Sequence, residues 1–266
     1  MNPSPIPSRQ SPRLPCYRSA VAAMALGLTA TDAVVASVAT GHEAPAPVPE
    51  TVVLLHGWWS NPLSMLRLKW SLQRDGYHVV NLGYRSVRVP LEDIAAKRLP
   101  RAIARRVPSN APRVHFVTHS LGALLLREYL AHHPPANLGR IVMLGPPNQG
   151  SELAGVGHGP FLQWIAGPNY RYLTLQSTLR AQLPTPSTEI GVVAGSHPGL
   201  HASRKLPTPH DGRVSVDATR LPGMTDHAVV PAGHSRLPWS STVVQLVKSF
   251  LVAGRFHPSL QPVHGQ

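Results

Sequence analysis

Short runs of consecutive apolar residues recur along this chain, and stretches with a three-to-four-residue apolar period separate them. Strands that are buried on both faces of a parallel sheet carry such continuous runs, because helices cover both faces. The runs predict six strands, at residues 51–55, 78–82, 114–118, 140–144, 189–194 and 228–230.

The stretches between these runs predict helices with one apolar face. A helix is expected before the second strand, with Asn61 as its cap and Pro62 at its first position. Strands that alternate with helices indicate the α/β class, with a mostly parallel central sheet covered by helices on both faces. Further helices are predicted over three stretches, 90–107, from Leu121 onward, and 241–251.

One long segment, 151–183, contains Gly, Pro and aromatic residues but no strand pattern. One interpretation is a small cap over the carboxyl edge of the sheet, where open α/β sheets bind substrates. The other is an ordinary helix and crossover loop. We therefore divide the chain into an Ala/Pro-rich extension (1–49), an α/β domain (50–256) with 151–185 as its cap or lid segment, and a tail (257–266).

The chain is strongly basic, with 25 Lys and Arg against 12 Asp and Glu and a formal charge of +13. The basic residues of the predicted helix 90–107 lack the aromatic interleaving of a nucleic-acid groove, so we expect a solvated face and no nucleic-acid partner. Association with an anionic membrane surface stays open. Cys16 is the single cysteine, which rules out an intramolecular disulfide, and no Cys/His spacing suggests a metal site.

The first 39 residues combine a basic region, an apolar region and a small-residue S-V-A site that ends at Ala39. This order resembles an export signal, although Asp32 interrupts the apolar part. A disordered extension or a misplaced start codon are the alternatives. The protein is expected to be exported or periplasmic if 1–39 is a signal peptide, and cytoplasmic otherwise.

Ser120 stands where the predicted strand 114–118 gives way to the helix that begins at Leu121, in the sequence THSLG. A serine on such a tight turn projects its hydroxyl above the sheet, and the first helix amides point at whatever that hydroxyl attacks. This is the nucleophile elbow, usually G-x-S-x-G. Gly122 fits the pattern and Thr118 departs from it. The alternative is a serine that merely caps a core helix.

A serine nucleophile needs a histidine base and a carboxylate that orients the base, and in folds with an elbow they follow in the order serine, acid, histidine. Asp211 lies in an Asp-Gly turn after the 189–194 strand, where the acid is expected. Asp217 falls in an extended segment predicted to lie at the surface, and Asp226 is a reserve acid before the last strand. The acids after residue 144 are Glu152, Glu189, Asp211, Asp217 and Asp226.

His234 lies in the loop between the last strand and the last helix, which is the expected place of the base. The oxyanion of an acyl-transfer intermediate needs two backbone donors. The amide of Leu121, directly after Ser120, is one. The amide of Trp58 is the other, because His56-Gly57-Trp58 follows the first strand and Gly57 lets the backbone come close.

The chain resembles the α/β-hydrolase superfamily, specifically its small bacterial esterase/lipase-like group, over about residues 51–251. The resemblance is carried by VVLLHGWWSNPLSM, VHFVTHSLGALLLREYL, VMLGPPNQGSELA, DGRVSVDATRLPGMTDH and VVPAGHS. It implies an α/β-hydrolase fold and a triad of Ser120, Asp211 and His234, with the Trp58 and Leu121 amides as the oxyanion hole. Elbows that begin with threonine occur in this group. The resemblance also implies that neither a metal nor an organic cofactor is used.

The resulting hypothesis is a serine hydrolase of carboxylic esters, acting on a small-molecule or lipid ester through an acyl-enzyme. An acyltransferase or amidase with the same triad is the alternative within enzymes. A non-catalytic binding protein that uses the fold as a scaffold is the alternative outside them. The sequence leaves the acyl group, the alcohol and the oligomeric state undefined.

Overall fold

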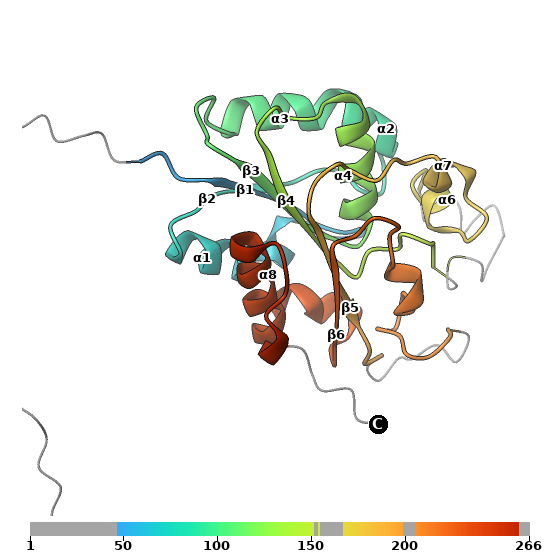
Figure 1. Ribbon diagram of the computed structural model, residues 1–266. Helices are drawn as coiled ribbons and strands as arrows, with labels where there is room; N and C mark the ends of the chain where they lie inside the picture. Colours follow the sequence, from blue (N-terminus) through green and yellow to red (C-terminus); the bar gives the residue numbers. More distant parts are fainter. Residues whose placement is uncertain (1–46, 152–153, 155–166, 199–205, 261–266) are drawn as a thin grey trace, which may run out of the picture. The chain divides into compact units, whose positions relative to one another are not determined.

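A parallel six-stranded sheet forms the centre of the protein (Figure 1). The computed structural model describes residues 47–151, 154, 167–198 and 206–260. Every described strand pair is parallel, and the strand order is β2-β1-β3-β4-β5-β6. The strands are β1 (Thr51–Leu55), β2 (His78–Leu82), β3 (Val114–His119), β4 (Leu138–Leu144), β5 (Ile190–Gly195) and β6 (Asp226–Val230).

All six predicted strands are present, which confirms the α/β class and the parallel sheet. The first two have the predicted ends, and the others differ by one or two residues at an end. The carboxyl ends of all strands meet at one edge of the sheet because all strands are parallel. Loops after β1, β3, β5 and β6 are therefore brought together there.

Helices cover both faces of the sheet, as predicted (Figure 1). Alternate residues of each strand point to opposite faces, so Val53 and Leu55 belong to one core while Val52 and Leu54 belong to the other. One face carries α2 (Leu91–Asp93), α3 (Leu99–Arg106) and α4 (Leu121–His132), and the other carries α1 (Leu66–Arg74) and α8 (Ser241–Ala253).

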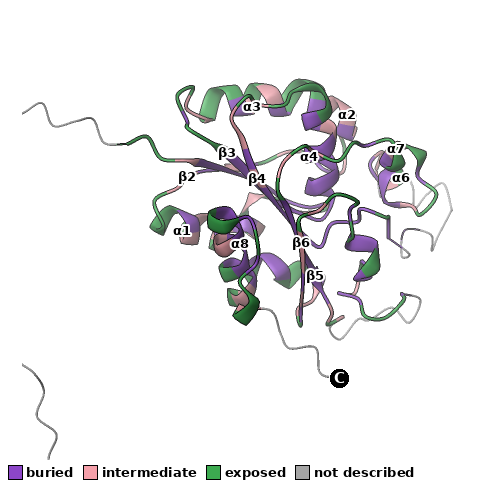
Figure 2. Ribbon diagram, viewed as in Figure 1, coloured by how far each residue is buried: buried purple, intermediate pink, exposed green. Residues whose placement is uncertain are grey.

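Helix ends follow the predicted capping chemistry. The side chain of Asn61 accepts a hydrogen bond from the Leu63 amide (2.9 Å) and caps the 3₁₀ turn Pro62–Met65, which runs into α1. The predicted helix 90–107 is present, but it consists of α2, a π turn at Ile94–Arg98 and α3. The strands and α4 are buried, whereas the outer side of α3 is exposed (Figure 2). None of the helices described is long and apolar enough to cross a bilayer.

The predicted cap segment is only partly within the described residues, which here comprise 151, 154 and 167–185. This part forms two short helices, α6 (Tyr170–Leu173) and α7 (Thr178–Ala181), and contains no strand. Arg127 on α4 anchors the chain after α7, because it donates hydrogen bonds to the carbonyls of Leu183 and Pro184. It also donates to Asn148 Oδ1.

The segment around Asp217 differs from the prediction of an extended surface stretch. Asp217 begins a 3₁₀ turn, Asp217–Thr219, and its flanking apolar residues are buried. Alternating apolar residues suggested an extended chain, but tertiary packing takes the same residues inward around a turn. Asp217 itself is exposed and pairs with Arg220. Residues 1–46 of the expected extension (1–49) and residues 261–266 of the expected tail (257–266) lie outside the described residues.

Candidate active site

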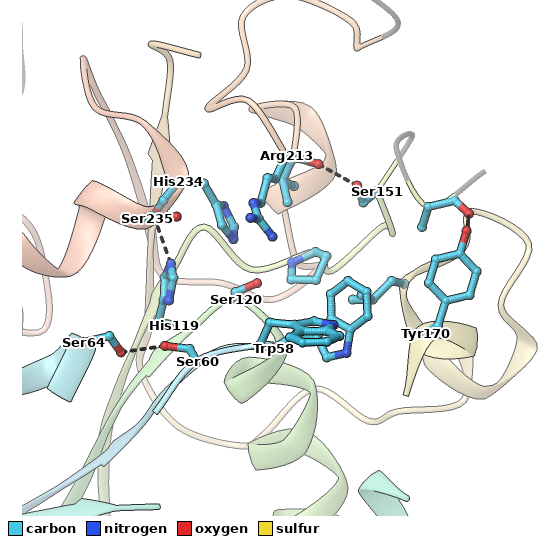
Figure 3. Close-up of a pocket in the computed structure, with 15 residues that line it drawn as sticks. Trp58, Ser60, Ser64, His119, Ser120, Ser151, Tyr170, Arg213, His234 and Ser235 are labelled. Carbon is cyan, nitrogen blue, oxygen red and sulfur yellow. Dashed lines mark hydrogen bonds between the residues drawn. The ribbon is translucent and has the colours of Figure 1, made fainter. Parts of the chain in front are cut away.

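Ser120 joins β3 to α4 in a strained backbone conformation. Its φ of 53° and ψ of −125° lie in a region that residues other than glycine rarely occupy. The Ser120 amide donates to the Leu144 carbonyl (2.9 Å), which ties the turn to β4. As a result the side chain leaves the sheet and faces a cavity (Figure 3). This is the geometry expected of a nucleophile elbow rather than of a capping serine.

The elbow is crowded, and this explains its glycines. A Cβ on Gly122 would lie 2.7 Å from the carbonyl oxygens of both Leu55 and His56, and a Cβ on Gly57 would lie 3.0 Å from Ser120 Cβ. The first position of the motif tolerates Thr118, whose side chain is fully buried. Within the described part of the chain, Thr118 Oγ1 has no hydrogen-bond partner.

Asp211 and His234 form a buried pair. Asp211 Oδ2 lies 2.7 Å from His234 Nδ1, and Asp211 Oδ1 accepts hydrogen bonds from the amides of Arg213 (2.9 Å) and Val214 (2.8 Å). The His234 amide also donates to the Asp211 carbonyl (2.9 Å). Burial alone would raise the pKa of Asp211, but the His234 ring and the two amides together lower it below its usual value. Asp211 is therefore a carboxylate, and it holds the proton of His234 on Nδ1.

The other candidate acids within the described residues, Asp217, Asp226 and Glu189, have structural partners. Asp226 begins β6 and accepts hydrogen bonds from the amides of His227 and Phe256, both at 2.8 Å. Glu189 pairs with Arg140. Glu152 lies outside the described residues. Of the four candidate acids within the described residues, Asp211 is the one that the structure brings to His234.

His119 belongs to the same cluster and was not singled out from the sequence. Its Nε2 donates to the His234 carbonyl (3.0 Å), and the two rings are 4.9 Å apart. Burial, and then the nearby His234 ring, lower the pKa of His119 to about 3, so it is neutral. Its position beside Ser120 in the motif was the available signal, but its partner lies 115 residues further along the chain.

The loop after β1 positions the Trp58 amide. His56 is buried and stacks on Tyr84 with 4.2 Å between ring centroids. His56 Nε2 accepts from the Tyr84 amide (3.3 Å), so its Nδ1 carries the proton and donates to the Gly57 carbonyl (2.9 Å). The C=O and N–H of a trans peptide point in opposite directions. Holding the Gly57 carbonyl therefore turns the Trp58 N–H the other way.

A cavity of about 320 Å³ lies over these groups. Figure 3 shows the ring of His234 directed toward Ser120, with Trp58 and Tyr170 along another wall. The Trp58 and Tyr170 rings are 6.2 Å apart, so the cap segment contributes to the cavity. Among the residues that the structure describes, no cluster of His, Cys, Asp and Glu could hold a metal ion.

The comparison with protein-family models assigns the chain to one family. The model of the alpha/beta hydrolase family matches residues 52–260, and the chain belongs to this family. No curated protein matches the sequence.

Solved structures with the same fold include esterases and lipases. The mature lipase BlEst2 of Bacillus licheniformis is 20% identical with a TM-score of 0.58, over 83% of this chain and 95% of the lipase. A metagenomic carboxyl esterase, MGS0156, is 20% identical with a TM-score of 0.56, over 74% and 69% of the two chains. Phospholipase PlaB of Legionella pneumophila is 20% identical with a TM-score of 0.55, over 64% of this chain but only 44% of the phospholipase. At these identities the likeness concerns the fold.

Proposed function

We propose that this protein is a carboxylic ester hydrolase in which Ser120 is the nucleophile, His234 the base and Asp211 the orienting acid. The observation that carries the proposal is the strained Ser120 turn facing the same cavity as a His234–Asp211 pair joined at 2.7 Å. An intact serine, acid and histidine in these places also argue against a purely non-catalytic scaffold.

In acylation, Ser120 Oγ attacks the ester carbonyl carbon while His234 Nε2 takes the serine proton. Nδ1 of His234 carries the ring proton and donates it in a hydrogen bond to Asp211, so Nε2 has the lone pair that accepts the serine proton. The carboxylate of Asp211 stabilises the positive charge that forms on the ring. When the tetrahedral intermediate collapses, His234 gives the proton to the departing alcohol. Water activated by His234 then attacks the acyl-enzyme and releases the acid.

The oxyanion that forms in both steps would lie between the amides of Trp58 and Leu121. The Leu121 amide is the first of α4, where the helix dipole favours negative charge. The Trp58 amide is directed by the bond between His56 and the Gly57 carbonyl. Loss of one such donor raises the barrier by about 3 kcal/mol, or more than a hundredfold in rate.

A fluorophosphonate probe tests the nucleophile directly. We expect the wild-type protein to be labelled on the peptide that contains Ser120, and Ser120→Ala to be unlabelled and inactive on p-nitrophenyl esters. Ser235→Ala is the matched control, because Ser235 lies in the same cavity without being at the elbow. Labelling that persists in Ser120→Ala would refute the assignment.

A further inference from the structure

Arg213 places a cation in the cavity of the proposed active site. Figure 3 shows its side chain directed into the cavity beside His234 and Ser120. Its side chain is exposed to solvent rather than packed into the core. Nothing in the hydrolysis of a neutral ester requires a guanidinium at this place, because the nucleophile, the base, the acid and the oxyanion donors are already supplied.

The backbone holds Arg213 firmly at this position. Arg213 stands two residues after Asp211, and its amide donates a hydrogen bond to Asp211 Oδ1 (2.9 Å). Its carbonyl accepts a hydrogen bond from Ser151 Oγ (2.5 Å), which fixes the other side of the same residue (Figure 3). The Cα of Arg213 is thus set relative to Asp211, while the side chain is left to face the cavity.

The part of the cavity wall that the structure describes offers no acid to neutralise this cation. Among the described residues that line it, none is Asp or Glu. Asp211 is 2% exposed, and its oxygens are taken by His234 and two amides. The neighbours of Arg213 in the cavity include hydroxyl groups, aromatic rings and neutral His119. A guanidinium in such surroundings is matched by a carboxylate or phosphate, which it binds through two parallel hydrogen bonds.

The surface next to the cavity has the same sign of charge. A neighbouring hollow of about 880 Å³ shares Trp59 and Ser60 with the cavity and contains Arg85 and Arg88. The next hollow shares Tyr84 and Arg85 with it. That third hollow adds four arginines from the π turn and α3, namely Arg98, Arg101, Arg105 and Arg106, and also Lys97, which pairs with Asp93 (2.7 Å). Such a field concentrates anions near the cavity, and salt weakens it.

We propose that the ester substrate carries an anionic group, a carboxylate or a phosphate, which Arg213 binds while Ser120 attacks the ester. This inference rests on the proposed function. Arg213 is then a residue that determines specificity and makes no contact with the reacting bond. The anion can belong to the acyl part, as in the monoester of a dicarboxylic acid, or to the alcohol part, as in an acyl glycerol phosphate.

The test uses two pairs of esters, and in each pair one member carries an anionic group that the other lacks. It is done at about 0.3 M salt to screen the outer arginines. The acyl pair is p-nitrophenyl hydrogen adipate and p-nitrophenyl hexanoate. The alcohol pair is 1-hexanoylglycerol 3-phosphate and 1-hexanoylglycerol, with released hexanoate measured. In one of the two pairs we expect wild-type kcat/KM to be about tenfold higher for the anionic ester, the size of a charge-assisted hydrogen bond.

Arg213→Gln should abolish this preference and change kcat/KM for the neutral ester of the same pair less than threefold. Arg213→Lys should retain part of the preference, since it keeps the charge but loses the bidentate geometry. Arg74→Gln is the matched control, because it removes one exposed arginine from the end of α1, outside all three hollows. It should behave as the wild type.

A wild-type enzyme that hydrolyses the neutral esters without preferring either anionic partner would overturn the inference and leave the proposed function intact. The same holds if Arg213→Gln keeps the full preference. If none of the four esters is hydrolysed, or if Ser120→Ala hydrolyses them as fast as the wild type, the proposed function fails first. The two failures are therefore distinguishable.

Discussion

The stability of the protein should fall as the pH drops below 6.5, and His119 should account for a defined part of the loss. His119 is 6% exposed, and its pKa is lowered to about 3. In the unfolded chain the same ring has a pKa of about 6.5. Between these two values the unfolded chain binds a proton that the folded protein does not. The contribution of His119 is therefore complete above pH 6.5 and is lost progressively as the pH falls toward 3.

The size of this effect follows from linkage. Each pH unit below the unfolded pKa lowers the free energy of unfolding by about 1.4 kcal/mol. At pH 5, about 1.5 units below that value, the loss from His119 is about 2 kcal/mol. The full slope applies down to pH 5 because this pH is still well above the folded pKa of about 3.

Urea unfolding of the wild type and of His119→Asn at pH 8 and pH 5 measures this contribution. Asparagine can still donate a hydrogen bond to the His234 carbonyl but does not titrate. Between the two pH values the wild type should lose about 2 kcal/mol more than His119→Asn. His133→Asn controls for the loss of a histidine at an exposed position. Equal losses in the wild type and His119→Asn would refute the account of His119 as a buried neutral ring.

Three substitutions probe the rest of the site. Asp211→Asn should lower kcat on p-nitrophenyl esters by about 10⁴-fold. Asp226→Asn should leave kcat nearly unchanged, because the Asp226 side chain binds two backbone amides instead of His234. The reverse result would assign the acid to Asp226. Gly122→Ala should lower kcat/KM about 100-fold, because its Cβ would lie 2.7 Å from two carbonyl oxygens and displace the elbow; wild-type activity would contradict that packing. Thr118→Val should raise the free energy of unfolding in urea by about 1 kcal/mol, because it replaces a buried hydroxyl that has no partner among the described residues; a lower value would show that the hydroxyl is hydrogen-bonded.

The sheet could be predicted because each strand corresponds to a short run of apolar residues in the local sequence. Chain order then selected Asp211 and His234, and the structure brings these two side chains together at 2.7 Å. The prediction of one continuous helix over 90–107 did not take account of Pro100, which has no N–H to donate and whose ring disturbs the i→i−4 bonding at Ala96. The π turn at Ile94–Arg98 lies at this point of the helix. The turn at Asp217 was missed because alternating apolar residues look the same in an extended chain and in a buried turn.

The contents of the cavity were predictable only in part. Ser120, His234 and the Trp58 loop follow from the order of strands and loops. The positions of His119 and Arg213 in the cavity depend on contacts with other segments, His119 with His234 and Arg213 with Ser151. No local pattern encodes which loops will meet above a sheet edge. The proposed reacting groups could therefore be selected from the sequence, but the charge of the cavity around them could not.

The hydrogen bonds of Arg127 have a practical consequence for remodelling the protein. They fasten the chain at Leu183 and Pro184 to α4, while Asn148 is held both by Arg127 and by its bond to the Thr219 carbonyl (2.9 Å). Both ends of the stretch between Ser151 and Gln182 are thus clamped to the scaffold from outside it. An insert from another hydrolase could be spliced between those junctions on two conditions. It must supply apolar side chains in place of Tyr172 and Leu173, which belong to the core, and a side chain that keeps the hydrogen bonds of buried Asn169 to the Leu91 amide and to the Ser86 and Val89 carbonyls. The α/β domain would then act as a scaffold that accepts different cap segments.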